Sequence, residues 1–188
     1  MAAGLGLLWL GAIVLQHRSP PAILWAALDA VAHGAAAGLC TVWLWPAFGA
    51  RPVVSAMLAG TLIDVDHAVA AHSLDPHRMM SLDARPPTHS LAGAAVFGVL
   101  AWAAFGAIDG YAVAIGVLAH LLGDAVEPAG VPFLAPFVAS AQMHVPTWAL
   151  GLGIGLSACA SAALAQRARA GGQIQGWGCR QGGRRWSN

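Results

Sequence analysis

Three ionisable side chains close an apolar segment near the middle of the chain. Asp64, Asp66 and His67 follow the run from Val53 to Ile63, which contains no charged residue. A charged side chain deep in a membrane segment costs roughly 2.5–3.5 kcal/mol on insertion scales, so such groups are usually paired. Two carboxylates beside an imidazole bind hard or borderline cations. The pattern therefore indicates a metal site at membrane depth.

Helical geometry limits how these three groups can act together. Asp64 and His67 would share one face of a continuous helix, whereas Asp66 would point away from them. Because all three can meet one ion only near a helix end, we expect the helix to loosen here. His120 and Asp124 share one face of a later apolar segment and can hold an ion from two successive turns.

A third group of polar residues follows two prolines at positions 86 and 87. Thr88 and Ser90 are ordinary capping residues, and Thr88 is expected to cap the next helix. Arg85 can hold a phosphate or carboxylate, and His89 can bind a metal or transfer protons. His33 lies alone in an earlier apolar segment, where a hydrogen bond to a neighbouring group explains it equally well.

The composition indicates an integral membrane protein. Of 188 residues, 58% are hydrophobic and 9% are charged, which is too apolar for an ordinary soluble domain. The net charge of +1 gives no sign of a nucleic-acid partner. The three cysteines are far apart and form no CxxC pair, so neither a disulfide framework nor a thiolate zinc site is indicated.

We predict an all-α, polytopic bundle of about five to six transmembrane helices, since one span needs about 20 residues. Residues 1–166 form the membrane domain, and the Arg/Gly-rich residues 167–188 are expected to be a disordered tail. Alternating spans place Asp64, His89 and His120 on the same side of the membrane. The expected spans are 3–16, 22–45, 53–71, 90–107, 111–126 and 147–166, with a polar loop at 72–87 and a proline-spaced connection at 127–146.

Four short motifs occur in a fixed order along the chain. They are His33-Gly34, the stretch Leu62 to His67, the stretch Arg85 to Ser90, and Ala119 to Asp124 followed by Pro128 to Pro132. Together, over about residues 30–137, they resemble the predicted membrane-bound metal-dependent hydrolase family, which includes LexA-regulated inner-membrane proteins of bacteria. Members of that family show DxDH, HRGxTHS and HxxxD motifs, the last followed by TxxGVP.

The resemblance implies a set of metal ligands and two departures from the family pattern. Ala84 stands where the family has the first His of HRGxTHS, and Pro86 replaces its Gly, so that ligand is missing or replaced by His77. Glu127 and Pro128 displace the Thr of TxxGVP. The implied metal ligands are His33, Asp64, Asp66, His67, His89, His120 and Asp124.

The expected function is a membrane-embedded hydrolase acting on a lipid-like ester or phosphoester. A divalent ion, with zinc expected first and manganese or iron as alternatives, would activate a water molecule. Arg85 would steady the anionic group, and His89 or Asp66 would accept the proton. The alternatives are a transporter or channel that moves cations or protons through the same residues, and a structural protein whose metal fastens helices. The absence of a visible internal repeat favours the enzyme over the transporter.

The arginines predict the orientation in the inner membrane. By the positive-inside rule, the side with more arginines faces the cytoplasm, so both termini are expected there and the site is expected to face outward. Six arginines fall on the side opposite the site and three on its own side: Arg51, Arg167, Arg169, Arg180, Arg184 and Arg185, against Arg18, Arg78 and Arg85.

Overall fold

The computed structural model describes residues 1–18, 20–138 and 142–170. In this part of the chain the regular structure is helical, apart from one isolated antiparallel bridge between Val131 and Met143. The helices are α1 (Ala2–Gln16), α2 (Ala22–Thr41), the 3-10 turn η1 (Val42–Leu44), α3 (Trp45–Phe48), α4 (Arg51–Leu62), α5 (Val65–Ala70), α6 (Pro76–Met80), α7 (Leu91–Phe105), α8 (Ala107–Asp124) and α9 (Thr147–Ala170).

The all-α membrane bundle is confirmed. Among the described residues, four helical stretches are long and apolar enough to cross a membrane: Ala22–Phe48, Arg51–Ala70, Ala107–Asp124 and Thr147–Ala170. The helices α1 and α7 are apolar but shorter. Many large apolar side chains on these helices face outward, including Leu7, Leu100 and Leu156, which are more than half exposed. A surface of this kind is stable against lipid rather than water.

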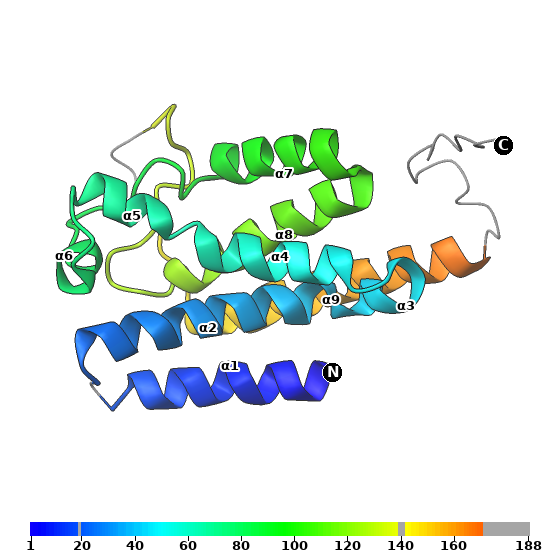
Figure 1. The fold of residues 1–188 in the computed structure, drawn as a ribbon, viewed down its shortest axis with the longest axis horizontal. Helices are drawn as coiled ribbons and strands as arrows, with labels where there is room; N and C mark the ends of the chain where they lie inside the picture. Colours follow the sequence, from blue (N-terminus) through cyan, green and yellow to red (C-terminus); the bar gives the residue numbers. More distant parts are fainter. Residues whose placement is uncertain (19, 139–141, 171–188) are drawn as a thin grey trace, which may run out of the picture.

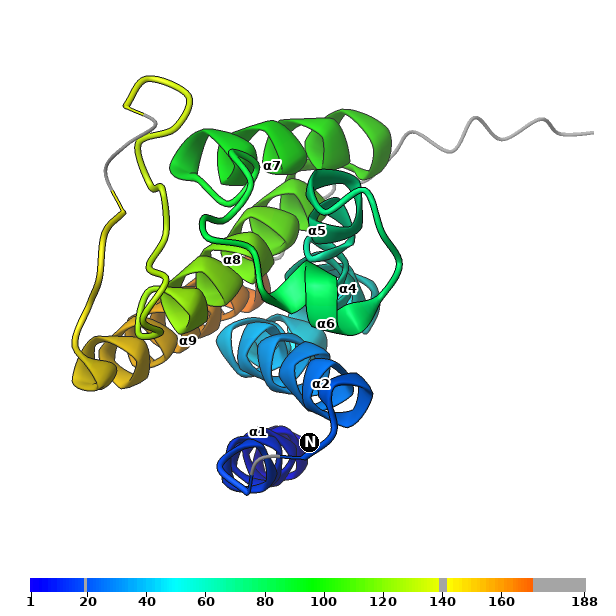
Figure 2. The same ribbon diagram turned by 90° about the vertical axis from the view of Figure 1, so that its left-hand side faces the viewer.

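Helix α8 lies inside the bundle and packs against α2, α4, α7 and α9 (Figures 1 and 2). Helix α1 packs against the outer side of α2. The short helices α5 and α6 lie together at one end of the bundle. The beginning of α1 and the end of α9 both point to the opposite end.

The crossing of α4 and α8 depends on small residues. A Cβ added to Gly116 would lie 2.3 Å from the carbonyl oxygen of Ala56, and one added to Gly60 would lie 3.1 Å from the carbonyl oxygen of Gly116. Both helices therefore approach with backbone against backbone, as small residues allow in membranes. Ala56 and Ala112 are completely buried beside this contact. The close approach also brings the carbonyl group of Gly60 to the side of α8.

The helix loosens at Asp64, as predicted. Helix α4 ends at Leu62 and α5 begins at Val65, so the expected span 53–71 consists of two helices joined by a turn. The expected end of the second span at residue 45 was wrong. Helical structure continues through η1 and α3 to Phe48, because Pro46 lies in the first turn of α3, where an amide hydrogen is not needed.

Two boundaries later in the chain also differ from expectation. The fifth span begins at Ala107 rather than residue 111, because the break between helices is Gly106, whose φ of 102° suits glycine. Helix α9 continues to Ala170, so residues 167–170 of the expected disordered tail are helical. The rest of that tail, residues 171–188, lies outside the described residues.

Replacing Gly116 by alanine should destabilise the bundle by about 1–3 kcal/mol, because the added methyl group must push α4 away from α8. The measurement is thermal unfolding of the purified protein in detergent. The matched control is Gly155→Ala on α9, where an added Cβ meets nothing within 4 Å. Equal unfolding temperatures for the two variants would contradict the proposed role of the α4–α8 crossing.

Candidate metal centre

The seven residues implied as metal ligands lie together at the end of the bundle that carries α5 and α6. Helix α2 contributes a histidine, the α4–α5 turn and the start of α5 contribute three residues, the segment before α7 contributes another histidine, and the end of α8 contributes two residues. The seven residues are His33, Asp64, Asp66, His67, His89, His120 and Asp124. Alternation of the spans predicted this shared side, and the structure confirms it.

Four side-chain atoms converge at the centre of this cluster. His120 Nε2 lies 3.0 Å from Asp124 Oδ2 and 3.3 Å from Asp64 Oδ1. His89 Nε2 lies 3.3 Å from Asp64 Oδ1, 3.2 Å from His120 Nε2 and 3.7 Å from Asp124 Oδ2. We call these four residues the central quartet. His89, His120 and Asp124 are almost completely buried, and Asp64 is partly buried.

Hydrogen bonds on the far side of each imidazole determine what the quartet can bind. His120 Nδ1 is 2.8 Å from the carbonyl oxygen of Gly60, to which it must donate its hydrogen. His89 Nδ1 is 3.2 Å from Asp66 Oδ2 and is placed to donate to it. In both neutral imidazoles Nε2 then carries a lone pair. Two lone pairs and two carboxylate oxygens then face one another, and either a metal ion or protons on the imidazoles can stabilise this arrangement.

The spacing of the quartet fits a tetrahedral metal ion. Zinc held by nitrogen and oxygen atoms at about 2.0–2.1 Å has neighbouring ligands about 3.3–3.4 Å apart. The five measured separations run from 3.0 to 3.7 Å. Asp124 Oδ2 is buried and makes no hydrogen bond, although nitrogen atoms of His120, Arg85 and His89 lie 3.0–3.7 Å from it. An oxygen in this position can also bind a metal ion.

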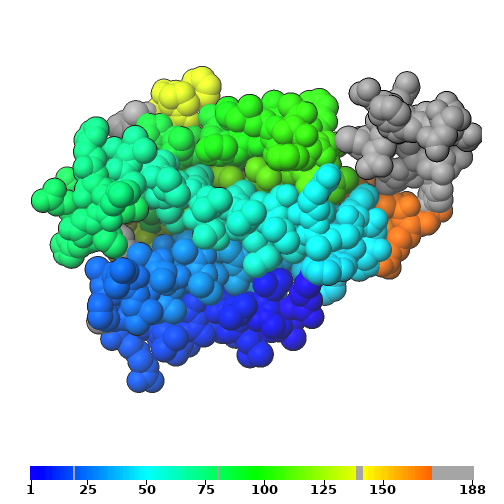
Figure 3. Space-filling view, in the orientation of Figure 1, coloured from blue at the N-terminus to red at the C-terminus, as the bar shows by residue number. Residues whose placement is uncertain are grey.

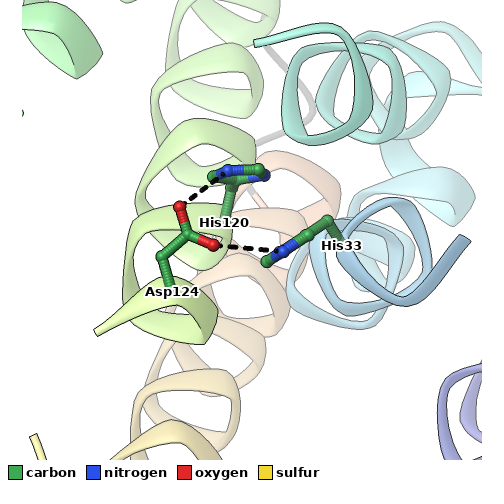
Figure 4. A group of neighbouring side chains, drawn as sticks. All are labelled: His33, His120 and Asp124. Carbon is green, nitrogen blue, oxygen red and sulfur yellow. Dashed lines mark ion pairs between the residues drawn. The ribbon is translucent and has the colours of Figure 1, made fainter. Parts of the chain in front are cut away.

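Two further groups flank the quartet. On one side, Asp124 reaches His120 with one carboxylate oxygen and His33 with the other, at 3.3 Å (Figure 4). On the other side, His67 Nδ1 lies 3.1 Å from Asp66 Oδ1 and 3.5 Å from Asp64 Oδ1, and neither His67 Nδ1 nor Asp66 Oδ1 has a hydrogen bond. Asp124 and Asp64 can therefore each join the quartet to a neighbouring group, and the chemistry of the donors allows more than one ion.

Thr88 has a different role from the one expected. The cap of α7 is Ser90, whose hydroxyl oxygen accepts a hydrogen bond from the amide of Gly93. The hydroxyl group of Thr88 instead donates a short hydrogen bond to Asp66 Oδ2. Thr88 therefore helps to hold the carboxylate that faces His89. Of the two residues named as possible caps, Ser90 caps α7 and Thr88 does not, because Ser90 directly precedes the first residue of the helix.

Arg85 contacts the edge of the cluster. Its guanidinium group lies 3.2 Å from Asp124 Oδ2 and 2.6 Å from Glu127 Oε2, and its Nε donates to the carbonyl oxygen of Gly130. Burial raises the pKa of Glu127 above its usual value, although the charge of Arg85 opposes that change. Glu127, which stands near the position of the Thr in the TxxGVP motif, therefore forms an ion pair with Arg85.

The pKa of His89 shows which charge the site favours. Burial alone would lower the pKa of its imidazole, but the carboxylates of Asp64 and Asp66 outweigh burial and raise that pKa above its usual value. The neighbourhood of His89 therefore favours positive charge, which either protons or a metal ion can supply.

A cavity of about 270 Å³ opens beside the cluster. It is lined by Asp64 and His67 from the cluster, by Arg85 and Glu127, and by Asp29. Sequence reasoning did not include Asp29 among the site residues, although its spacing from His33 on α2 could have suggested it, and the two lie 3.6 Å apart. His72 and His77 are exposed and belong to none of the three candidate metal groups found among the described residues.

The family model for the YdjM inner membrane protein matches residues 22–178, which is most of the chain. The chain belongs to the YdjM inner membrane protein family. No curated protein and no solved structure matches it. Membership of the YdjM family, together with the apolar helices, makes this an integral, multi-pass inner-membrane protein. The hydrolase activity implied by the sequence resemblance stays a prediction.

Replacing Thr88 by valine should weaken metal binding about 10- to 100-fold, because it removes the hydrogen bond that orients Asp66. The measurement is competition of the metal-loaded protein with a chelator of known affinity. Thr41→Val is the matched control, since Thr41 is buried and its hydroxyl group bonds only within α2, to the carbonyl oxygen of Ala37. Equal affinities in the two variants would show that Thr88 does not support the site.

Proposed function

We propose that the protein is a membrane-embedded, metal-dependent hydrolase that acts on a lipid-like phosphoester. The observation that carries this proposal is the central quartet, in which two carboxylates and two imidazole lone pairs converge next to a cavity lined by Arg85. A metal site with an arginine beside it is suited to binding an anionic group and activating water.

The central quartet would hold the ion, for which its mixed nitrogen and oxygen donors favour zinc, with manganese or iron as alternatives. When bound, the ion supplies Lewis acidity that makes water a stronger nucleophile and polarises the phosphoryl group. In this arrangement His89 serves as a ligand, because its Nε2 belongs to the quartet.

The remaining groups have separate roles. Arg85 presents a planar guanidinium group at the cavity and can bind two oxygens of a phosphate. His67 lines the same cavity and contacts Asp66, so this pair can accept the proton that water loses. The cluster lies where one membrane-spanning helical stretch ends, at Asp124, and another bends, at Asp64, which supports a substrate supplied by the bilayer.

Transport of cations or protons is the main alternative, because intramembrane aspartates and histidines also form ion pathways. The contact that continues from the site between α4 and α8 consists of Gly60, Ala56, Gly116 and Ala112. Backbones packed at this distance leave no room for water between these two helices. This packing supports a site closed on that side rather than a pathway.

The proposed site faces away from the cytoplasm. Arg51 and the last turn of α9, which carries Arg167 and Arg169, lie at the end of the bundle opposite the site (Figure 1). By the positive-inside rule this arginine-rich end is cytoplasmic. The orientation thus rests on the arginine distribution alone.

Purified protein in nanodiscs should release phosphate from phosphatidic acid or an isoprenyl phosphate, and a chelator should stop the reaction until zinc or manganese is restored. Arg85→Lys should lower kcat/KM about 100-fold, because an ammonium group cannot replace the two-pronged contact with phosphate. Arg78→Lys, an exposed residue of α6, is the matched control and should leave the rate unchanged. Absence of metal-dependent release from either lipid would count against the proposal.

A further inference from the structure

A second cavity lies on the outer side of the bundle, between α4, α7 and α8. Its volume is about 420 Å³. Its lining is almost entirely apolar, and its main residues are Leu58, Leu62, Ile63, Phe97, Val113 and Val117. We call it the apolar groove. Figure 3 shows this face of the molecule, with part of α8 visible between α4 and α7.

The apolar groove runs parallel to the helices and has two distinct ends. Asp66 lines one end, on the side of the metal cluster. Ser55 and Phe105 line the other end, and Ser55 donates a hydrogen bond there to Asp109, which also pairs with Arg51. Residues 55 to 66 cover roughly 16 Å at 1.5 Å per helical residue. This length is about half of the 30 Å hydrocarbon core of a bilayer.

The dimensions of the groove determine what can occupy it. A volume of 420 Å³ over about 16 Å gives a mean width of about 6 Å for the space open to the centre of a water-sized sphere, and the walls of the groove stand a few ångströms farther apart. A helix with its side chains is about 10–12 Å wide, so it cannot enter. One row of methylene groups, which contact carbon atoms at about 3.5–4.0 Å, fits this width.

The surroundings favour a lipid chain as the occupant. The walls come from helices that cross the membrane or pack against those that do, so hydrocarbon surrounds the mouth of the groove. The polar groups among the lining residues stand at its two ends, and the carboxylate at the site end contacts His89, a member of the central quartet. A chain lying in the groove would therefore end at the metal cluster.

We propose that the apolar groove binds one hydrocarbon chain of a membrane lipid, with the head group at the Asp66 end and the chain terminus near Phe105. That the bound lipid is a substrate rests on the proposed function. If it is, the substrate class is narrowed to lipids with a long hydrocarbon chain. The substrate then has a long chain that lies along the helices, and its head group lies at Asp66, next to His89 of the central quartet.

The test uses the full-length protein in nanodiscs that contain phosphatidic acid with a photoreactive diazirine on one acyl chain. After irradiation and digestion, mass spectrometry locates the labelled residues. A diazirine at the chain terminus should label Phe105 and Val113, and one near the ester should label Leu62 and Ile63. The residues of the groove should be labelled several-fold more than Leu152 and Leu156, which are exposed apolar residues on α9. Excess unlabelled phosphatidic acid should suppress the labelling of the groove.

Two variants that fill the groove with a tryptophan side chain, called the filling variants, and one matched control test whether the labelling depends on the groove. Val113→Trp and Leu58→Trp place a ring inside the groove, and either should abolish the groove labelling in protein that stays folded. Val99→Trp lies on the outer face of α7, where the side chain is 56% exposed, and should leave labelling unchanged. Equal labelling of the groove and of α9 would overturn the proposal. So would a dimer that only the filling variants dissociate, because a second copy would then occupy the groove.

The same experiments distinguish failure of the lipid-binding proposal from failure of the hydrolase proposal. Groove labelling that persists in Asp64→Asn, together with no hydrolysis of the same lipid by the wild-type protein, supports the lipid groove and contradicts the hydrolase. Metal-dependent hydrolysis that is unchanged by both filling variants, with no preferred labelling, supports the hydrolase and overturns the groove.

Discussion

The site depends on one electrostatic constraint: four acceptor atoms meet inside an apolar bundle. The hydrogen bond from His120 to the carbonyl oxygen of Gly60 directs the lone pair of His120 toward Asp64 and Asp124. Carboxylates that lose water in such a place are costly, and a cation at the centre offsets that cost. The surrounding hydrogen bonds, including the one from Thr88, hold the acceptors in this position.

The fold serves this constraint through close helix packing. His120 can reach the backbone of α4 because Gly116, one turn earlier on α8, lets the two helices touch. A larger side chain at either glycine would move His120 away from Gly60, so packing and metal affinity are linked. The turn at Asp64 has a complementary effect, because it frees Asp64 and Asp66 to face different partners.

The sequence predicted the cluster well because its members are ionisable groups in apolar segments, where each needs a partner. Alternation of the spans then placed His89 and His120 on the same side. The sequence offered both Thr88 and Ser90 as capping residues, and the fold shows that Ser90 caps α7 while Thr88 bonds to Asp66. Ligand roles themselves follow from no spacing rule, so they stay predictions that the geometry makes specific.

Elemental analysis of the detergent-purified protein, with Asp64→Ala and His120→Ala as comparison variants, shows directly whether the quartet binds a divalent metal. We expect at least one zinc, manganese or iron ion per chain in the wild-type protein and loss of that ion in both variants. A folded wild-type protein that contains no metal, even after incubation with these ions, would contradict metal binding by the quartet and would favour a proton-holding polar network in the same place.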